Sequence, residues 1–313
     1  MKITVLDAKT LGDDIDVNIL GDDVDAYGTT APSEVAERIA ESHVVVVNKI
    51  KLFEDNLKDA KNLKLICVAA TGYDNIDTEY CKKRGIAVCN VVGYSTNSVA
   101  QLTVSMALSL VMHQKEYSDF VRDGRYTKSG VANRLTPTYY ELAGKTWGIV
   151  GLGNIGKQVA KVAEAFGCRV VAFKRTPDED YDCVELSELM EKSDIISVHL
   201  PASDATNGII SRDMIGKMKK TAVLVNVARG VVCDEEALTD AILEDKILGI
   251  GIDVYSQEPF GKEHPYSKIL DRDNVILTPH IAWGAYESRV RCLEEIRKNI
   301  EAFFAGDKRN RIV

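Results

Sequence analysis

Three residues whose side chains suit hydride transfer to a carbonyl group occur late in the chain, each shortly after an apolar run. They are Arg229, Glu258 and His280, and the runs span residues 222–227, 249–254 and 275–277. The planar fork of an arginine binds carboxylate and carbonyl oxygens in pairs. An imidazole can exchange a proton with the reacting oxygen near neutral pH, and a bonded carboxylate fixes its tautomer. We therefore predict that Arg229 binds substrate and that His280, paired with Glu258, is the acid–base.

Each of these residues taken singly has an ordinary structural explanation. A lone histidine is more often a packing residue than a catalyst, and arginine and glutamate are most often solvated. Their shared placement decides the interpretation, because ligands of doubly wound sheets bind where the parallel strands end.

A glycine-rich segment indicates what supplies the hydride. Residues 151–156 read GLGNIG, a G-x-G-x-x-G string between an apolar run and a helical pattern. In that context Gly151 permits a tight turn, Gly153 lets the backbone approach a pyrophosphate, and Gly156 allows the helix to pack on the strand. The helix N-terminus adds free N–H groups for the phosphates. We predict a dinucleotide site here.

The next strand lacks the acidic residue that usually binds the ribose of NAD. Lys174 occupies that position and is followed by Arg175 and Thr176. With no carboxylate to repel it, a 2′-phosphate would meet two cations. We hypothesise a preference for NADP over NAD. The alternative is that both cations are solvated and that the enzyme prefers NAD or does not discriminate.

Apolar runs alternate with helical patterns through most of the chain. Strands are expected at 3–6, 44–47, 65–69, 86–92, 147–150, 169–173, 195–200, 222–227, 249–254 and 275–277, and helices at 33–42, 98–113, 154–166 and 287–304. Continuously apolar strands separated by helices indicate parallel sheets covered on both faces, which is an α/β fold. We expect Gly167 to end the third helix, residues 126–140 to form a loop, and the last helix to pack on the first domain.

Composition sets limits on the remaining functions. The 313 residues include 39 basic and 47 acidic ones, giving a net charge of −8, which disfavours nucleic acid and anionic lipid as partners. No signal peptide and no apolar run of about 20 residues is visible, so we expect a cytoplasmic protein. The seven cysteines form no Cys-x-x-Cys pair and are predicted to be reduced. We predict no metal site.

The chain resembles the D-isomer-specific 2-hydroxyacid dehydrogenase family over nearly its whole length. The motifs that carry the resemblance are ATGYDNID at 70–77, GLGNIG at 151–156, NVARG at 226–230, DVYSQEP at 253–259 and TPHIA at 278–282. The resemblance implies a Rossmann cofactor domain, residues 99–287, inserted into a flavodoxin-like substrate domain, residues 1–98 and 288–313. It also implies a homodimer formed through the cofactor domain. Arg229, Glu258 and His280 match the family's catalytic positions.

The resemblance and the strand ends together give a list of expected ligand contacts. Those for the cofactor are Gly151, Gly153, Asn154, Ile155, Gly156, Lys174, Arg175, Thr176, His199, Leu200, Pro201, Thr206, Val227, Ala228, Arg229, Asp253, His280 and Ala282. Those for the substrate are Asn48, Lys49, Thr71, Gly72, Arg229, His280 and Trp283. For Lys49 an unbonded surface position, and for Trp283 a place in the core, are equally acceptable explanations.

Two further segments resemble one branch of the family, the glycerate dehydrogenases and hydroxypyruvate reductases. They are GYSTNSVAQ at 93–101 and HIAW at 280–283. We predict reduction of hydroxypyruvate or glyoxylate to D-glycerate or glycolate. Three alternatives stay open: a dehydrogenase for a different keto acid, one for formate or phosphonate, and a dinucleotide-sensing binding protein that resembles the family's transcriptional corepressors.

Overall fold

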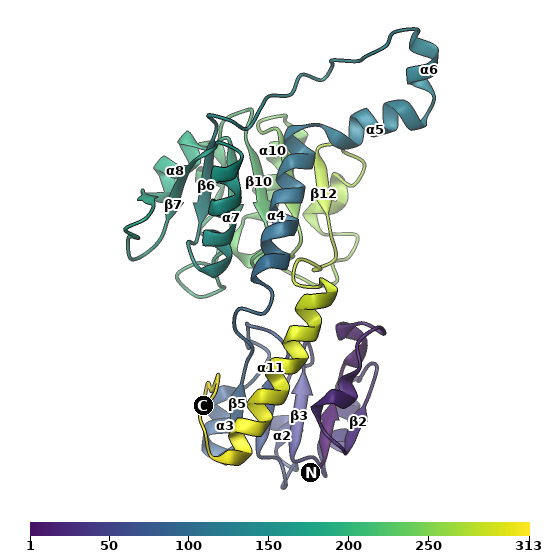
Figure 1. Cartoon of the computed structure of the whole chain (residues 1–313), viewed down its shortest axis with the longest axis vertical. Helices are drawn as coiled ribbons and strands as arrows, with labels where there is room; N and C mark the ends of the chain where they lie inside the picture. Colours follow the sequence, from purple (N-terminus) through teal and green to yellow (C-terminus); the bar gives the residue numbers. More distant parts are fainter. The chain divides into compact units, whose positions relative to one another are not determined.

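The computed structural model describes all 313 residues as two compact units. The first contains residues 1–95 and 284–313, and the second contains residues 96–283. Figure 1 shows the elements of both units, coloured along the sequence. The division was expected after residue 98 and before residue 288. Each unit is built around a parallel sheet, so the predicted α/β class is confirmed.

The first unit has a five-stranded sheet in the order β2-β1-β3-β4-β5. Its strands are β1 (Ile3–Val5), β2 (Val24–Ala26), β3 (Val44–Val47), β4 (Leu65–Val68) and β5 (Ala87–Cys89). Its helices are α1 (Val35–Ile39), α2 (Glu54–Leu57), α3 (Thr78–Arg84) and α11 (Tyr286–Ala305), with 3-10 turns η1 (Ala8–Leu11), η2 (Val17–Leu20) and η3 (Pro32–Glu34). This strand order is the flavodoxin-like one.

Helix α11 returns from the end of the chain to this first sheet. It packs against β4 and buries Cys292, Leu293 and Ile296. The side chain of Asn299 donates to the Asn90 carbonyl at 3.0 Å. The prediction that the last helix joins the first domain is therefore confirmed.

The second unit has a seven-stranded sheet in the order β12-β11-β10-β9-β6-β7-β8. Its strands are β6 (Thr146–Val150), β7 (Arg169–Phe173), β8 (Asp182–Cys183), β9 (Ile195–Val198), β10 (Val223–Asn226), β11 (Gly249–Ile252) and β12 (Val275–Leu277). Its helices are α4 (Thr96–Val111), α5 (Gln114–Arg122), α6 (Arg125–Ser129), α7 (Asn154–Ala165), α8 (Leu186–Lys192), α9 (Arg212–Gly216) and α10 (Glu235–Leu243), with 3-10 turns η4 (Gly230–Val232) and η5 (Pro265–Lys268). Counted from β6, this is the Rossmann order with one strand added.

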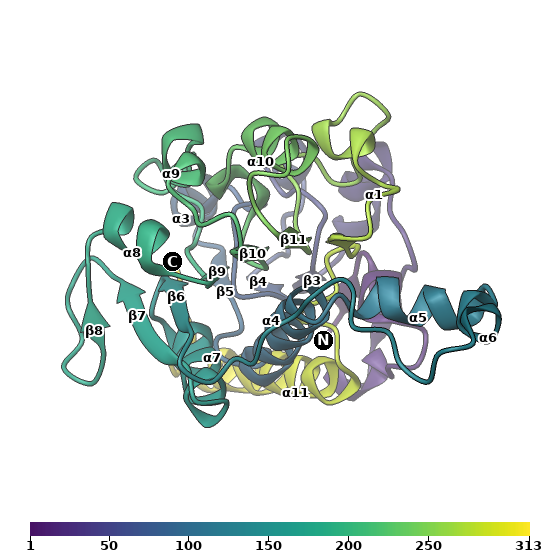
Figure 2. The same ribbon diagram turned by 90° about the horizontal axis from the view of Figure 1, so that it is seen from above.

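Helices cover both faces of the second sheet, as Figure 2 shows. Successive strand residues point to opposite faces, so Val223 and Val225 pack in the core cluster with α4 and α7. Leu224 packs in the other cluster with α8, α9 and α10. Burial on both faces explains why these strands read as continuous apolar runs.

Several local predictions need correction. The helix expected at 33–42 is confined to α1, preceded by η3. The loop expected at 126–140 begins as helix α6, which is bounded by Gly124 and Gly130 in the left-handed conformation, with φ of 80° and 66°. The edge strands β2 and β8 were not predicted, because they are short and only partly buried. Gly167 follows α7 at φ 79°, as expected for a residue that ends a helix.

Candidate active site

The register of the second sheet aligns the predicted site residues. Phe173, Val150, Val198, Asn226, Ile252 and Leu277 pair across six neighbouring strands as one continuous row. The residues that follow this row begin the loops with the predicted ligand contacts: Lys174, Gly151, His199, Val227, Asp253 and Thr278. Hydrogen bonds continue the ladder into these positions, for example from the Asp253 N–H to the Asn226 carbonyl at 3.0 Å. The sheet thus brings distant sequence segments to one edge.

The glycine loop has the shape that a dinucleotide requires. A Cβ on Gly151 would lie 2.9 Å from the backbone of His199, and one on Gly156 would lie 2.4 Å from the Gly151 carbonyl. A Cβ on Gly153 would meet nothing within 4 Å, so that space is open to a ligand. Helix α7 starts at Asn154 without a side-chain cap, which leaves the N–H groups of its first turn available to phosphate oxygens.

Asn226 holds the turn that carries Arg229. Its side chain accepts from the Ala228 N–H at 3.0 Å and donates to the Arg229 carbonyl at 3.0 Å. The guanidinium is half-buried and donates to the Ala228 carbonyl at 2.8 Å. The turn is therefore fixed by the buried end of β10, at the same edge as the glycine loop.

Glu258 and His280 are in direct contact. The Glu258 Oε2 lies 2.6 Å from the His280 Nδ1, and the Tyr255 N–H donates to the other carboxylate oxygen at 3.0 Å. A carboxylate on Nδ1 fixes the neutral ring in the tautomer whose Nε2 accepts a proton. His280 has a φ of 55°, a left-handed conformation that is uncommon for a residue other than glycine and typical of functional positions.

Asp253 holds the segment that contains His280. Its carbonyl accepts from the His280 N–H at 2.9 Å, and its carboxylate accepts from the N–H groups of Ile281 and Ala282 at 2.8 and 2.9 Å. Burial raises the pKa of Asp253, while the hydrogen bonds from Thr278 and from these backbone groups lower it. Asp253 was expected to contact the cofactor; its contacts in the structure position the segment that contains His280.

Comparison with known proteins identifies the family. The domain described as D-isomer specific 2-hydroxyacid dehydrogenase, NAD binding domain, matches residues 104–282. A glycerate dehydrogenase of Methylorubrum extorquens is 36% identical over 310 residues, which are 99% of this chain and 98% of the relative. This chain belongs to the D-isomer-specific 2-hydroxyacid dehydrogenase family. The resemblance found in the sequence is thereby confirmed, and the protein is an oxidoreductase with the family's NAD binding domain.

Other family relatives and solved structures agree with this assignment. A hydroxypyruvate reductase of Thermotoga maritima is 37% identical over 85% of this chain and 86% of its own length. A D-lactate dehydrogenase from Aquifex aeolicus, solved with NAD and lactic acid, has a TM-score of 0.86 and 31% identity, covering 98% of this chain and 96% of that one. An acyclic imino acid reductase solved with NADPH and D-Arg has a TM-score of 0.84 and 29% identity, covering all of both chains.

The loop after β7, where the ribose contacts were expected, differs from the expectation in one respect. A carboxylate is present: Asp178 Oδ2 lies 2.9 Å from the Lys174 Nζ and 2.8 Å from the Lys157 Nζ. Hydrogen bonds from the ammonium groups of Lys157, which has the larger effect, and of Lys174 lower the pKa of Asp178 to about 2. Asp178 is therefore ionised at neutral pH. The sequence analysis missed Asp178 because the chain must turn back after Thr176 to bring it to Lys174. Arg175 and Thr176 are exposed beside this cluster.

The remaining expected cofactor contacts lie along the same edge. His199, Leu200 and Pro201 follow β9, and the Thr206 hydroxyl donates to the Pro201 carbonyl at 2.6 Å. Burial lowers the pKa of His199 to about 3, so its ring is neutral at physiological pH. The contacts recorded for these residues hold the loop after β9 in one shape.

Residues of the substrate list in the first unit follow β3 and β4. Asn48 is buried and donates to the Thr10 hydroxyl at 3.0 Å, while its N–H and that of Lys49 donate to Asp7. Thr71 donates to the Val91 carbonyl at 2.9 Å. Asn48 and Thr71 thus use their side chains within this unit, whereas Lys49 is exposed and Gly72 half-buried.

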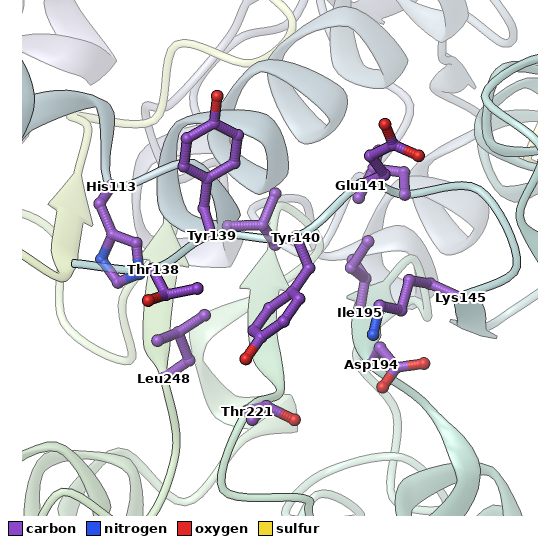
Figure 3. Close-up of a pocket in the computed structure, with 12 residues that line it drawn as sticks. His113, Thr138, Tyr139, Tyr140, Glu141, Lys145, Asp194, Ile195, Thr221 and Leu248 are labelled. Carbon is purple, nitrogen blue, oxygen red and sulfur yellow. The ribbon is translucent and has the colours of Figure 1, made fainter. Parts of the chain in front are cut away.

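Trp283, the last residue of the substrate list, lies in the second unit. Trp283 packs against the core cluster of α4 and α7, and its Nε1 donates to the His280 carbonyl at 3.1 Å. A cavity of about 120 Å³ lies where the strands begin, lined in part by His113, Tyr140, Lys145 and Asp194 (Figure 3). It contains none of the predicted site residues.

No helix combines the length and hydropathy needed to cross a bilayer.

Proposed function

We propose that this enzyme reduces hydroxypyruvate and glyoxylate to D-glycerate and glycolate, with NADPH or NADH as the hydride donor. The observation that carries the proposal is the 2.6 Å contact between Glu258 and His280 at the sheet edge that also holds the glycine loop. Relatives named glycerate dehydrogenase, hydroxypyruvate reductase and glyoxylate reductase, at 34–38% identity, support this choice of acids.

In the proposed mechanism each polar residue has one task. The Arg229 guanidinium binds the substrate carboxylate and the carbonyl oxygen, which fixes the face that is reduced. When bound, the nicotinamide supplies the hydride. His280 donates its Nε2 proton to the oxygen as negative charge develops there, and the Glu258 carboxylate stabilises the imidazolium before transfer. In the reverse direction neutral His280 takes the hydroxyl proton.

A panel of keto acids tests the substrate assignment. Initial rates with hydroxypyruvate, glyoxylate, pyruvate, a branched keto acid and phenylpyruvate should give the highest kcat/KM for the first two. Formate and phosphite with the oxidised cofactor serve as donors for the alternative chemistries. Activity confined to the branched or aromatic acids would overturn the substrate, while turnover of any 2-keto acid preserves the mechanism.

A binding protein without turnover is the second class of function to separate. Such a protein would bind NAD(P)H and release it unchanged. The specific pairing of Glu258 with His280 favours the enzyme, because a sensor has no use for a positioned acid–base. If no acid or donor of the panel gave turnover while calorimetry showed cofactor binding, the sensor would be the better explanation.

We propose that NADPH is used in preference to NADH. Lys174 and Arg175 directly follow β7, where NAD-binding relatives of this fold place an acidic residue, and the carboxylates of the loop begin only at Asp178. Relatives have been solved with NAD and with NADPH, so the family accommodates both. The ratio of kcat/KM for the two cofactors at one keto acid concentration decides the matter. A large advantage for NADH would refute the preference.

We also propose a homodimer formed through the arm α5–α6 of the cofactor domain. The arm leads away from the sheet of its unit (Figures 1 and 2), and the segment after it carries exposed apolar residues, including Val131 at 59% and Leu135 at 74%. An apolar patch on an extended segment favours a protein partner. Light scattering coupled to gel filtration should give about 69 kDa, twice the 34.5 kDa of the chain.

The remaining expectations about partners and location are also proposals. The net charge of −8 supports an enzyme that does not bind nucleic acid or anionic membranes. All seven cysteines are unpaired, which suits the reducing cytoplasm. Catalysis in this proposal uses no metal ion, so treatment with a chelator should leave the rate unchanged.

A further inference from the structure

A second carboxylate–imidazole pair lies close to the first in the second unit. Glu235, the first residue of α10, and His264 are each only 9% exposed, and the His264 Nε2 lies 3.0 Å from the Glu235 Oε2. The Tyr266 N–H donates to the His264 Nδ1 at 3.3 Å, so a neutral ring carries its hydrogen on Nε2. That Nε2 lies within ion-pair distance of the carboxylate but makes no hydrogen bond. Burying two ionisable side chains costs free energy, which points to a specific role for this pair.

Glu235 binds the turn that carries Glu258. The Ser256 N–H donates to the Glu235 Oε1 at 2.9 Å, and the Ser256 hydroxyl donates to the Oε2. Ser256 is two residues before Glu258. Tyr255, which directly precedes Ser256, donates its N–H to the Glu258 carboxylate at 3.0 Å. The same turn is thus bound by the Glu235 carboxylate at Ser256 and carries the Glu258 carboxylate that contacts His280.

Aromatic side chains tie this turn to the strand end before His280. The ring of Phe260 lies 4.7 Å from that of Tyr255 and 4.8 Å from that of His264. The Tyr255 hydroxyl donates to the Thr278 carbonyl at 2.8 Å. A shift of the turn would therefore move the residues on either side of the Glu258–His280 contact.

The turn is also closely fitted to the segment that carries Arg229. A Cβ on Gly230 would lie 2.0 Å from the carbonyl carbon of Tyr255 and 2.1 Å from the Ser256 nitrogen. Only glycine allows this approach, so the loops after β10 and β11 are in backbone contact. The turn has little freedom to relax if one of its bonds is lost.

We propose that Glu235 is a positioning residue for catalysis: through its two bonds to Ser256 it fixes the Ser256–Glu258 turn so that Glu258 can hold the His280 tautomer. The inference rests on the proposed function of Glu258 and His280. Glu235 itself touches neither the reacting atoms nor His280 in the contacts described. Its effect on the rate passes through Glu258, which distinguishes it from a residue that only adds stability.

Glu235→Gln is the first test, because it keeps the shape and replaces one of the two oxygens that accept from Ser256 by a donor. We expect kcat to fall by about tenfold or more, with the KM for NADPH unchanged within about twofold. Rates are measured at a temperature where circular dichroism shows the variant fully folded. The matched control is Glu236→Gln, an exposed neighbour on the same helix, which should stay within about twofold of wild type. If Glu235→Gln does not fold, Ser256→Ala removes only the hydroxyl bond and should lower kcat by about two- to fivefold.

A double-mutant cycle decides whether Glu235 acts through Glu258. In a Glu258→Gln background, the added Glu235→Gln change should cost less than about twofold in kcat. Nitrogen-15 spectra of labelled histidine add a readout of the tautomer, with the His280 signal assigned by its loss in His280→Ala. The wild-type signal should show a proton on Nδ1, and Glu235→Gln should give a mixture of tautomers.

Two results would overturn the inference: equal losses of kcat in both backgrounds, or a wild-type kcat and tautomer in Glu235→Gln while Glu258→Gln is strongly impaired. If Glu258→Gln itself kept wild-type activity, the proposed function of the first pair would fail instead.

Discussion

The two edges of the seven-stranded sheet differ in how their side chains are held. At the edge where the strands end, Asp253 is fully buried and its carboxylate accepts three hydrogen bonds, and Glu258 contacts His280 at 2.6 Å. At the edge where the strands begin, the cavity is bordered by Tyr139 and Tyr140, which are 47% and 63% exposed.

From this difference we expect the two edges to respond differently to mutation. Strand register fixes the positions of the side chains at the carboxyl edge, where the strands end. A small displacement there therefore changes the distances between the proposed reacting groups. The amino edge is closed by the segment that follows the arm, with Lys145 over the Tyr140 ring at 5.1 Å. We expect substitutions at the first edge to change kinetics and substitutions at the arm to change assembly.

The largest effect is expected for His280→Ala. Loss of the proton donor should lower kcat by about 10³- to 10⁴-fold, while NADPH still binds and raises the melting temperature as in wild type. Stopped-flow absorbance at the nicotinamide band and thermal shift measure the two quantities. Retention of more than a tenth of the activity would show that the carboxyl edge lacks the proposed acid–base.

Arg229→Ala should lower kcat/KM for the keto acid by about 10²- to 10³-fold, because the substrate loses both its carboxylate partner and its carbonyl contact. Arg229→Lys should restore little, since an ammonium cannot bind two oxygens in the same plane. Steady-state rates across keto acid concentrations provide the comparison. Full recovery by lysine would mean that only the charge matters there.

Glu258→Gln keeps the volume and removes the charge that stabilises the imidazolium. We expect kcat to fall by about 10- to 100-fold, less than in His280→Ala, because the ring remains to exchange the proton. Gln257→Glu in the same variant is a register control and should not recover the rate. Recovery would contradict the specific contact at position 258.

Lys174→Ala should have a smaller and selective effect. The KM for NADPH should rise about tenfold while that for NADH changes by less than about threefold, because only the 2′-phosphate needs the cation. Lys161→Ala, which removes an exposed lysine from the same helix as Lys157, is the control for net charge. Equal changes for both cofactors would place Lys174 outside the ribose site.

Leu135→Asp should leave kcat within about twofold of wild type and change the molecular mass of the protein in solution. A charge in the apolar segment after the arm should convert the proposed dimer into monomer, as measured by light scattering. Ile19→Asp, an exposed position in the first unit, should leave the mass unaltered. A loss of kcat together with the dimer would show that the two edges are not independent.

Strand positions in the core were predictable because buried strands are continuous apolar runs in the sequence. The limits of β3, β7 and β12 agree with the expected runs, since strands covered on both faces need continuous apolar residues. The short edge strands β2 and β8 carry no such signal. The helix α6 was missed because its residues, Arg125–Ser129, are polar and exposed, without apolar periodicity.

Local sequence patterns were enough to predict which residue types take part in the chemistry and which loops carry them. Glycine spacing, and polar residues directly after apolar runs, reflect local backbone geometry, which a linear pattern records. The tertiary structure alone decided which of these groups meet. The Glu258–His280 contact spans 22 positions, and the Lys157–Asp178, Glu235–Ser256 and Glu235–His264 contacts likewise join separate segments of the chain. Such contacts depend on strand register and on loop paths, and neither of these has a fixed spacing along the chain.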